Sequence, residues 1–318
     1  MKFEEIRNVA LIGAGTMGAG MSWCFAQAGY QVRLHDVSAQ QLERAVARIE
    51  AIEKLFVQEG LISAEAAQAA RLRIRPTPSL AESLAGVQYL LEAVPERLEL
   101  KRQLFVQFEA ACPPDTILAT NTSGLPITEI AAVCRYPGRV GGMHWANPPE
   151  LVPLVEVVRG EQTADSTVEL IYKVTEKLGK LAVVVNKDVP GFVSNRLQYA
   201  VLREALHLVD AGVVSAEDVD RTLKGGVGFR YPWLGPLETV DLGGVDLFQG
   251  ISHYLFQHLS NMTAPPEFFD QLVQEGKLGI KTGRGFYDYQ GVSREEVLRK
   301  RDLYFIRQLK LIREVKAS

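Results

Sequence analysis

The chain has 318 residues, 47% of them hydrophobic and 23% charged, and a formal net charge of −3. This composition is that of a globular protein with a sizeable core, and its charge gives no reason to expect a nucleic-acid partner. The cysteines Cys24, Cys112 and Cys134 lie far apart and form no CxxC pair, which argues against a disulfide framework or a metal site. Because no secretory signal and no bilayer-length apolar run are visible, we expect a cytoplasmic protein without a membrane partner.

Strand and helix signals alternate through the first half, which predicts an α/β fold with a doubly wound, Rossmann-type parallel sheet. Ser38 is a candidate N-cap for a long helix that ends near Gly60, and we expect Pro76 and Pro78 to interrupt the chain after a helix at 64–72. The predicted strands of this half are Asn8–Ile12, Gln31–Asp36, Val87–Glu92, Thr116–Thr120 and Arg139–Trp145.

Further β-branched runs at Leu151–Val158 and Leu181–Val185 predict two more strands, and helical periodicity dominates from Asn195 to about Ser260. We therefore place a Rossmann-type domain at residues 1–187 and an all-helical domain at 188–318. The tail from Ser293 to Val315 predicts an extra amphipathic helix with one apolar face, made of Phe305, Leu309 and Ile312.

A glycine-rich turn between the first strand and first helix is the strongest local motif: Gly13, Ala14, Gly15, Thr16, Met17 and Gly18. A GxGxxG motif alone is weak evidence, but here a second strand follows and ends in the acid Asp36. That context is typical of dinucleotide binding, with the pyrophosphate at the helix N-terminus. Because Asp36 can accept hydrogen bonds from ribose hydroxyls and would repel a 2′-phosphate, we expect NAD rather than NADP.

One histidine stands out as a candidate catalytic base. His144 ends an apolar strand, prolines follow at 148 and 149, and Glu156 lies on the returning strand. If the strands turn back at Pro148–Glu150, His144 and Glu156 lie opposite each other. A carboxylate placed there can fix the imidazole tautomer for proton transfer, which a secondary alcohol requires as it loses hydride.

Several ordered motifs resemble the L-3-hydroxyacyl-CoA dehydrogenase superfamily over nearly the whole chain. They are GAGTMG (13–18), EAVPE (92–96), NTSGLPITEI (121–130), HWANPP (144–149), LVEVV (154–158), DVPGFVSNR (188–196), GPLETVDLGGVD (235–246) and KTGRGFYDY (281–289). The resemblance implies a Rossmann-type domain followed by a helical domain that commonly forms homodimers. It also identifies His144 and Glu156 as the catalytic pair.

By the same resemblance, Ser123 and Asn195 are active-site residues that hydrogen-bond the substrate oxygen. From the residues alone, Ser123 could equally be a turn residue and Asn195 a helix N-cap. Four further residues match family positions at the cofactor site: Glu96, Lys101, Asn121 and Asn147. Of these, Lys101 could equally be a solvated helix residue.

The substrate is left open between two small-molecule classes. A short-chain L-3-hydroxyacyl-CoA is the first expectation, but Gln58 and Glu59 stand where this family usually has basic residues for CoA, and Lys54 lies one turn earlier. Other stretches resemble the branch of lambda-crystallin, L-gulonate dehydrogenase and carnitine dehydrogenase. In that alternative the substrate is a free hydroxy carboxylate and Arg230 could bind it with two hydrogen bonds.

Two points remain open. A remote alternative is a crystallin-like structural protein that binds NAD without turnover, and the set of Ser123, His144, Glu156 and Asn195 argues against it. The tail Gln290–Ser318 carries eight basic and four acidic residues. This tail could be a helix that packs at a dimer interface, or an element that closes over the substrate or attracts its phosphate.

Overall fold

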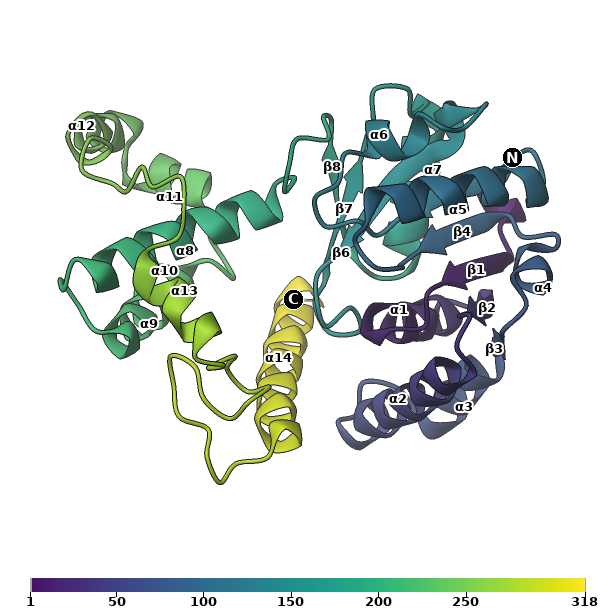
Figure 1. The fold of residues 1–318 in the computed structure, drawn as a ribbon, viewed down its shortest axis with the longest axis horizontal. Coiled ribbons are helices and arrows are strands. Elements are labelled where there is room, and N and C mark those ends of the chain that lie inside the picture. The colour runs from purple at the N-terminus through teal and green to yellow at the C-terminus, as the bar shows by residue number, and fades with distance from the viewer. Residues whose placement is uncertain (1, 318) are drawn as a thin grey trace. The chain divides into compact units, whose positions relative to one another are not determined.

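The fold is built around one sheet of eight strands in the order β3-β2-β1-β4-β5-β6-β7-β8 (Figure 1). It comes from a computed structural model that describes residues 2–317. The first six strands in this spatial order, from β3 through β2, β1, β4 and β5 to β6, are parallel. Strand β7 runs antiparallel to β6, and β8 is parallel to β7. The order 3-2-1-4-5-6 is that of a Rossmann-type sheet, so the predicted fold class is confirmed. The strands are β1 (Asn8–Ile12), β2 (Gln31–His35), β3 (Ile74–Thr77), β4 (Tyr89–Glu92), β5 (Ile117–Thr120), β6 (Val140–Trp145), β7 (Leu154–Val158) and β8 (Leu181–Val185).

Seven α-helices connect and cover these strands. Ser38 caps the longest of them as predicted, since its side chain accepts a hydrogen bond from the N–H of Gln41. The helices are α1 (Thr16–Gln27), α2 (Ala39–Gln58), α3 (Ala64–Leu72), α4 (Leu80–Leu84), α5 (Leu98–Ala111), α6 (Ile127–Ala131) and α7 (Asp165–Lys177), with 3₁₀ turns at Phe3–Glu5 and Pro137–Arg139.

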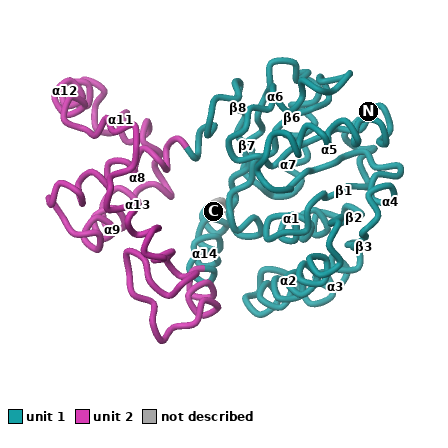
Figure 2. Tube along the Cα trace, in the orientation of Figure 1, with its two compact units in different colours: residues 1–195, 302–318 teal, residues 196–301 magenta. Residues whose placement is uncertain are grey.

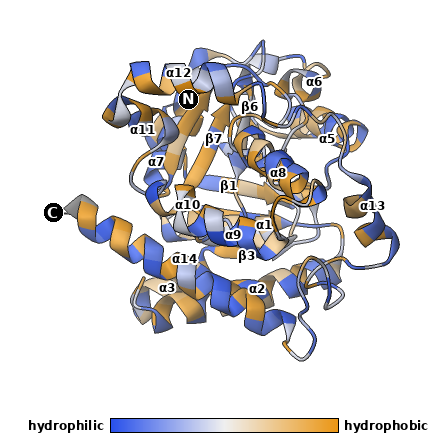
Figure 3. Ribbon diagram, turned by 90° about the vertical axis from the view of Figure 1, so that its left-hand side faces the viewer, coloured by the Kyte–Doolittle hydropathy of each residue, from blue (hydrophilic) through white to orange (hydrophobic). Residues whose placement is uncertain are grey.

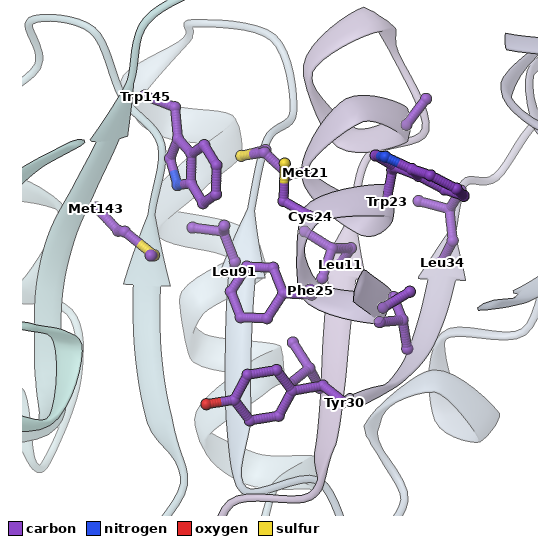
Figure 4. Close-up of a cluster of buried hydrophobic side chains, with 14 of the residues drawn as sticks. Leu11, Met21, Trp23, Cys24, Phe25, Tyr30, Leu34, Leu91, Met143 and Trp145 are labelled. Carbon is purple, nitrogen blue, oxygen red and sulfur yellow. The ribbon is translucent and has the colours of Figure 1, made fainter. Parts of the chain in front are cut away.

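The larger apolar core lies between α1 and the strands beneath it (Figure 4). Phe25 of α1 lies 6.2 Å from the ring of Trp145 in β6, and Trp23 meets Phe56 of α2 edge to face. This packing fixes the helix of the glycine motif to the strand that carries His144.

A second unit, residues 196–301, is distinct from the first, which comprises residues 2–195 and 302–317 (Figure 2). This unit is helical, as predicted. Its helices are α8 (Ser194–Asp210), α9 (Ala216–Gly225), α10 (Val227–Arg230), α11 (Pro236–Gly243), α12 (Val245–Leu255), α13 (Glu267–Gln274) and the first part of α14 (Arg294–Ala317). No helix in the described part of the chain is both long and apolar enough to cross a membrane.

The contacts divide the chain differently from the expected limits of 1–187 and 188–318. Phe192 is fully buried in the first unit, so that unit extends to Asn195. The second half of α14 also belongs to it, because Ile306 is fully buried in the core with Ile49, Ile52 and Phe56 of α2. Phe305 and Leu309 pack against the same cluster as the predicted face requires, but Ile306 is its most buried residue.

One predicted chain interruption is instead a strand. Pro76 lies in β3, opposite Leu34 of β2. A proline is tolerated there because β3 is the edge of the sheet and its missing N–H breaks no ladder bond on the open side.

Candidate active site

The glycine motif forms the turn between β1 and α1 that its sequence predicts. Gly13 has φ +104°, and a β-carbon there would lie 2.6 Å from the carbonyl oxygen of Ala93, so only glycine fits. Gly15 is the N-cap of α1 and uses no side chain for capping, and a β-carbon built on it would meet nothing within 4 Å. The N–H groups at Thr16, Met17 and Gly18 therefore begin a helix whose end is open to a phosphate.

Asp36 lies beside this turn, directly after β2. Its Oδ2 accepts a hydrogen bond from the N–H of Ala14 at 2.9 Å, and its Oδ1 accepts one from the N–H of Ser38 at 3.0 Å. Each carboxylate oxygen has a second lone pair, so Asp36 can hold the glycine turn and still accept hydrogen bonds from ribose hydroxyls. The open N-terminus of α1 at Gly15 and the half-exposed carboxylate of Asp36 fit the pyrophosphate and the ribose of NAD.

Lys101 is buried rather than solvated, so that alternative is wrong. Its side chain is 1% exposed, and its Nζ lies 2.7 Å from Glu92, which is fully buried at the end of β4. Thr120 and the N–H of Val94 also donate to Glu92. A buried carboxylate needs such partners, because a buried charge without hydrogen bonds or an ion pair costs about 3–5 kcal/mol of stability.

Glu96 connects this buried pair to the loop of Ser123. Its Oε2 lies 3.4 Å from Lys101 Nζ, and its Oε1 accepts hydrogen bonds from the Thr122 hydroxyl and the N–H of Ser123. Burial acts to raise the pKa of Glu96, but Thr122, Lys101 and the Ser123 N–H together outweigh it, and the pKa is lowered. Glu96 is thus a charged residue that holds the loop after β5.

The two asparagines assigned to the cofactor have different surroundings. Oδ1 of Asn121 accepts a hydrogen bond from the N–H of Trp145 at 2.8 Å, so this side chain joins the ends of β5 and β6. Asn147 is exposed, next to the buried Pro148 and Pro149. Of the two, Asn147 is the side chain presented to the surface.

His144 and Glu156 lie opposite each other in the antiparallel pair of β6 and β7, as the predicted turn requires. The Nδ1 of His144 is 2.8 Å from Oε2 of Glu156, and the two side chains are only 7% and 1% exposed. The ring of Phe192 packs edge to face on the imidazole, with centroids 5.5 Å apart. Because the carboxylate of Glu156 accepts, the proton lies on Nδ1 of His144 and the lone pair of the neutral ring lies on Nε2.

Glu156 is also bound by the segment that leads into α8. Its Oε1 accepts from the N–H groups of Val193 and Ser194, and its Oε2 accepts from the Ser194 hydroxyl at 2.7 Å. Burial acts to raise the pKa of Glu156, but the hydrogen bonds from His144, Ser194 and Val193 lower it to about 2. Glu156 is therefore the anionic partner of the histidine.

A strained turn makes these contacts possible. Phe192 has φ 50° although it carries a side chain, directly after Gly191 at φ 77°. Non-glycine residues in this region are held there by their surroundings and often mark functional sites. The turn directs two N–H groups at Glu156 and the Phe192 ring at His144.

Asn195 and Ser123 also lie together. The Asn195 side chain donates a hydrogen bond to the carbonyl oxygen of Ser123 at 2.8 Å, and the Ser123 side chain is exposed. The structure thus brings all four predicted catalytic residues into direct contacts, in the pairs His144–Glu156 and Ser123–Asn195. Ser194, at the start of the helix that carries Asn195, also bonds Glu156. Arg230 lies exposed at the end of α10 in the other unit.

Sequence reasoning missed three residues that shape this site: Phe192, Ser194 and Glu92. Phe192 and Ser194 lie in the motif DVPGFVSNR, where a glycine before an aromatic residue was the available signal. Glu92 ends an apolar run, and a charged residue at the end of a buried strand needs a partner.

Comparison with known proteins decides the family. Residues 8–189 match the profile of the 3-hydroxyacyl-CoA dehydrogenase NAD-binding domain, and residues 191–289 match that of the C-terminal domain of the same family. The chain belongs to the 3-hydroxyacyl-CoA dehydrogenase family. It is an NAD-dependent oxidoreductase that acts on a small-molecule substrate.

Members of this family with different substrates resemble the chain. The 5-formyl-3-hydroxy-2-methylpyridine 4-carboxylate 5-dehydrogenase of Mesorhizobium japonicum is 38% identical over 89% of this chain and 91% of its own. The crystal structure of an enzyme with the same activity, described as an NAD+-dependent dismutase, has a TM-score of 0.90, with 36% identity, 97% of this chain and 99% of that one covered. The (S)-3-hydroxybutyryl-CoA dehydrogenase PaaH1 of Ralstonia eutropha has a TM-score of 0.75, with 32% identity, 90% of this chain and 100% of that one covered.

The lowered pKa of Glu156 predicts a pH dependence of stability. A carboxylate with a folded pKa of about 2, against 4.5 when unperturbed, stabilises the fold fully above pH 4.5 and loses that contribution as the pH falls towards 2. The free energy of unfolding of the parent should exceed that of Glu156→Gln by a constant amount at neutral pH, and the difference should shrink below pH 4.5.

Denaturant unfolding at a series of pH values tests this. Ser194→Ala removes one donor to Glu156 and should produce a smaller loss with the same pH dependence. A parent-to-variant difference that stays constant down to pH 2.5 would show that Glu156 is not held ionised by these bonds.

Proposed function

We propose that this enzyme interconverts a hydroxy carboxylate and the corresponding oxo carboxylate as free acids, rather than as CoA esters. The observation that carries the proposal is the position of α14 at the C-terminal end of α2. Ile306 of α14 is buried with Phe56, and Lys310 lies 3.6 Å from Glu59. By the family resemblance, residues 55–60 correspond to a segment that usually carries basic residues for CoA, whereas this chain has Gln58 and Glu59 there, and Glu59 pairs with Lys310 of α14.

One basic residue of α2, Arg48, is paired with Glu150 and is therefore not a free cation for a CoA phosphate. The segment after Lys54 adds no basic residue before the end of the helix. The family profiles end at residue 289, before α14 begins at Arg294. The structure of the pyridine-carboxylate enzyme matches this chain with a TM-score of 0.90, against 0.75 for the CoA enzyme from Ralstonia eutropha.

The chemistry at His144 is the same for either substrate. NAD, when bound, takes the hydride from the alcohol carbon. His144 accepts the hydroxyl proton at Nε2 as the carbonyl forms, and Glu156 balances the positive charge from the Nδ1 side. Ser123 and Asn195 donate hydrogen bonds to the substrate oxygen, and Asn147 and Glu96 contribute to the nicotinamide side of the site. In the reverse direction His144 returns the proton to the oxygen. Arg230 remains a prediction as the residue that binds the carboxylate.

The decisive measurement is NADH oxidation with a panel of oxo carboxylates beside acetoacetyl-CoA. We expect at least one free acid, with acetoacetate included in the panel, to exceed the CoA ester in kcat/KM by about 100-fold or more, a difference of about 2.7 kcal/mol in transition-state binding. Efficient turnover of acetoacetyl-CoA, with the free acids inert, would overturn the carboxylate proposal and leave the hydride chemistry intact.

Removal of the proposed base should separate catalysis from cofactor binding. His144→Ala should lower kcat by about 10²–10⁴-fold, because proton transfer loses its acceptor, while the Kd for NADH stays within about threefold. His258→Ala, an exposed histidine of the helical unit, is the matched control and should retain full kcat. Comparable kcat in His144→Ala and the parent would exclude His144 as the base.

We further propose that the chain is a homodimer assembled through the helical unit. The helices α11 and α12, which Figure 3 colours by hydropathy, contain no buried residue. Several large apolar side chains on them are more than half exposed: Leu237, Leu242, Val245, Leu247 and Tyr254. Soluble proteins seldom leave such a surface uncovered, and dimers are common among proteins that this chain resembles.

Sedimentation equilibrium at micromolar concentration tests the dimer. The parent should sediment with twice the mass of one chain, and Leu242→Glu should shift it towards the monomer because a charge would be buried at the interface. Glu217→Gln, on the separate helix α9, serves as the control and should leave the mass unchanged. A parent that sediments as a monomer would contradict the proposal.

A further inference from the structure

The loop between β6 and β7, residues 146–153, is attached to the helix of the glycine motif. The carbonyl oxygen of Pro149 accepts hydrogen bonds from Cys24 Sγ of α1 at 3.7 Å and from Lys180 Nζ at 2.5 Å. Lys180 also bonds the carbonyl of Val152 at 2.9 Å. This loop follows β6, whose second-last residue is His144, and it carries Asn147, so its contacts with α1 bear on how this segment lies against that helix.

An ion pair inside this region joins the loop to α2. Oε1 of Glu150 lies 3.0 Å from Nη2 of Arg48, and the Glu150 side chain is only 5% exposed. Its Oε2 is buried and has no hydrogen-bond partner among the described residues. Burial raises the pKa of Glu150 and the repulsion of Asp302 on α14 adds to this, while Arg48 and Lys180 act to lower it. A buried ion pair is poor evidence for added stability, so its value here lies in the geometry that it selects.

Gly20 allows this approach. It lies within α1, where alanine would suit the helix better. A β-carbon at Gly20 would collide with Oε2 of Glu150 and lie 2.7 Å from Cγ of Pro149. The helix therefore has glycine, rather than a residue of higher helix propensity, at the point where Glu150 and Pro149 contact it.

We propose that Gly20, Arg48 and Glu150 set the distance between the phosphate-binding end of α1 and the segment that carries His144 and Asn147. Glu150 is then a positioning residue for hydride transfer, and it touches neither substrate nor cofactor. The inference rests on the proposed roles of His144 and Asn147 but not on the identity of the substrate. It holds equally for a free carboxylate and for a CoA ester.

The sharpest variant is Gly20→Ala, for which two effects oppose each other. Helix propensity alone predicts a higher thermal midpoint and unchanged catalysis. Displacement of the loop predicts instead that kcat falls by about tenfold or more while the Kd for NADH changes by less than about threefold, because the glycine turn and Asp36 remain intact. The nicotinamide fluorescence of bound NADH should change at the same time, and this readout needs no substrate.

Glu150→Gln and Arg48→Met should give the same split between kcat and the Kd for NADH, and Arg48→Lys should restore part of kcat. The matched control is the pair of Glu53 and Arg71, which also involves α2 at 3.0 Å but joins it to α3. Glu53→Gln should leave both kcat and the fluorescence of bound NADH unchanged.

The proposal is overturned if Gly20→Ala and Glu150→Gln bind NADH with the parent's fluorescence and turn over at the parent's rate. It is equally overturned if Glu53→Gln reproduces their effect, since any ion pair on α2 would then suffice. A parent enzyme that turns over only CoA esters would overturn the carboxylate proposal but not this one, because the fluorescence of bound NADH would still decide the role of Glu150.

Discussion

The site depends on one buried carboxylate. Glu156 is almost fully buried, so every lone pair that it directs into the protein has to be satisfied by a donor. The donors come from His144 on the neighbouring strand and from Val193 and Ser194 at the start of α8. One charge therefore links β7, its neighbouring strand β6, the turn at Phe192 and the first residue of α8. The histidine is oriented as a consequence of that requirement.

Glu92 follows the same rule, since it is fully buried at the end of β4 and is held by Lys101. Glu96 lies in the loop after β4, is exposed, and receives donors from the loop that carries Ser123. Hydride transfer needs donor and acceptor held to within a few tenths of an ångström of their reactive separation, and a buried, hydrogen-bonded charge such as Glu156 or Glu92 resists movement more than apolar packing alone. The polar network thus prepares the site before substrate arrives.

The proposed substrate class rests on the helix α14. Ile306 and Lys310 bring it against the end of α2, and Asp302 lies near the ion pair of Arg48 and Glu150. The same helix thus covers the C-terminal end of α2 and adds charge beside the loop after His144. Under the proposed function, this added element at the edge of the Rossmann-type unit sets the substrate class, while the reacting residues stay the same.

The sequence by itself determined what short-range rules control. The glycine turn, Asp36 after β2 and the N-cap at Ser38 follow from local backbone requirements, and the facing of His144 and Glu156 follows from strand periodicity and a single turn. Only the tertiary structure decided the partners that lie far apart in the chain. The burial of Lys101, the place of Ile306 in the core of the first unit and the pairing of Arg48 with Glu150 across 102 residues all depend on which elements pack together. No local propensity encodes those choices, because a lysine, an isoleucine or an arginine on a helix has the same sequence pattern whether it faces solvent or a partner.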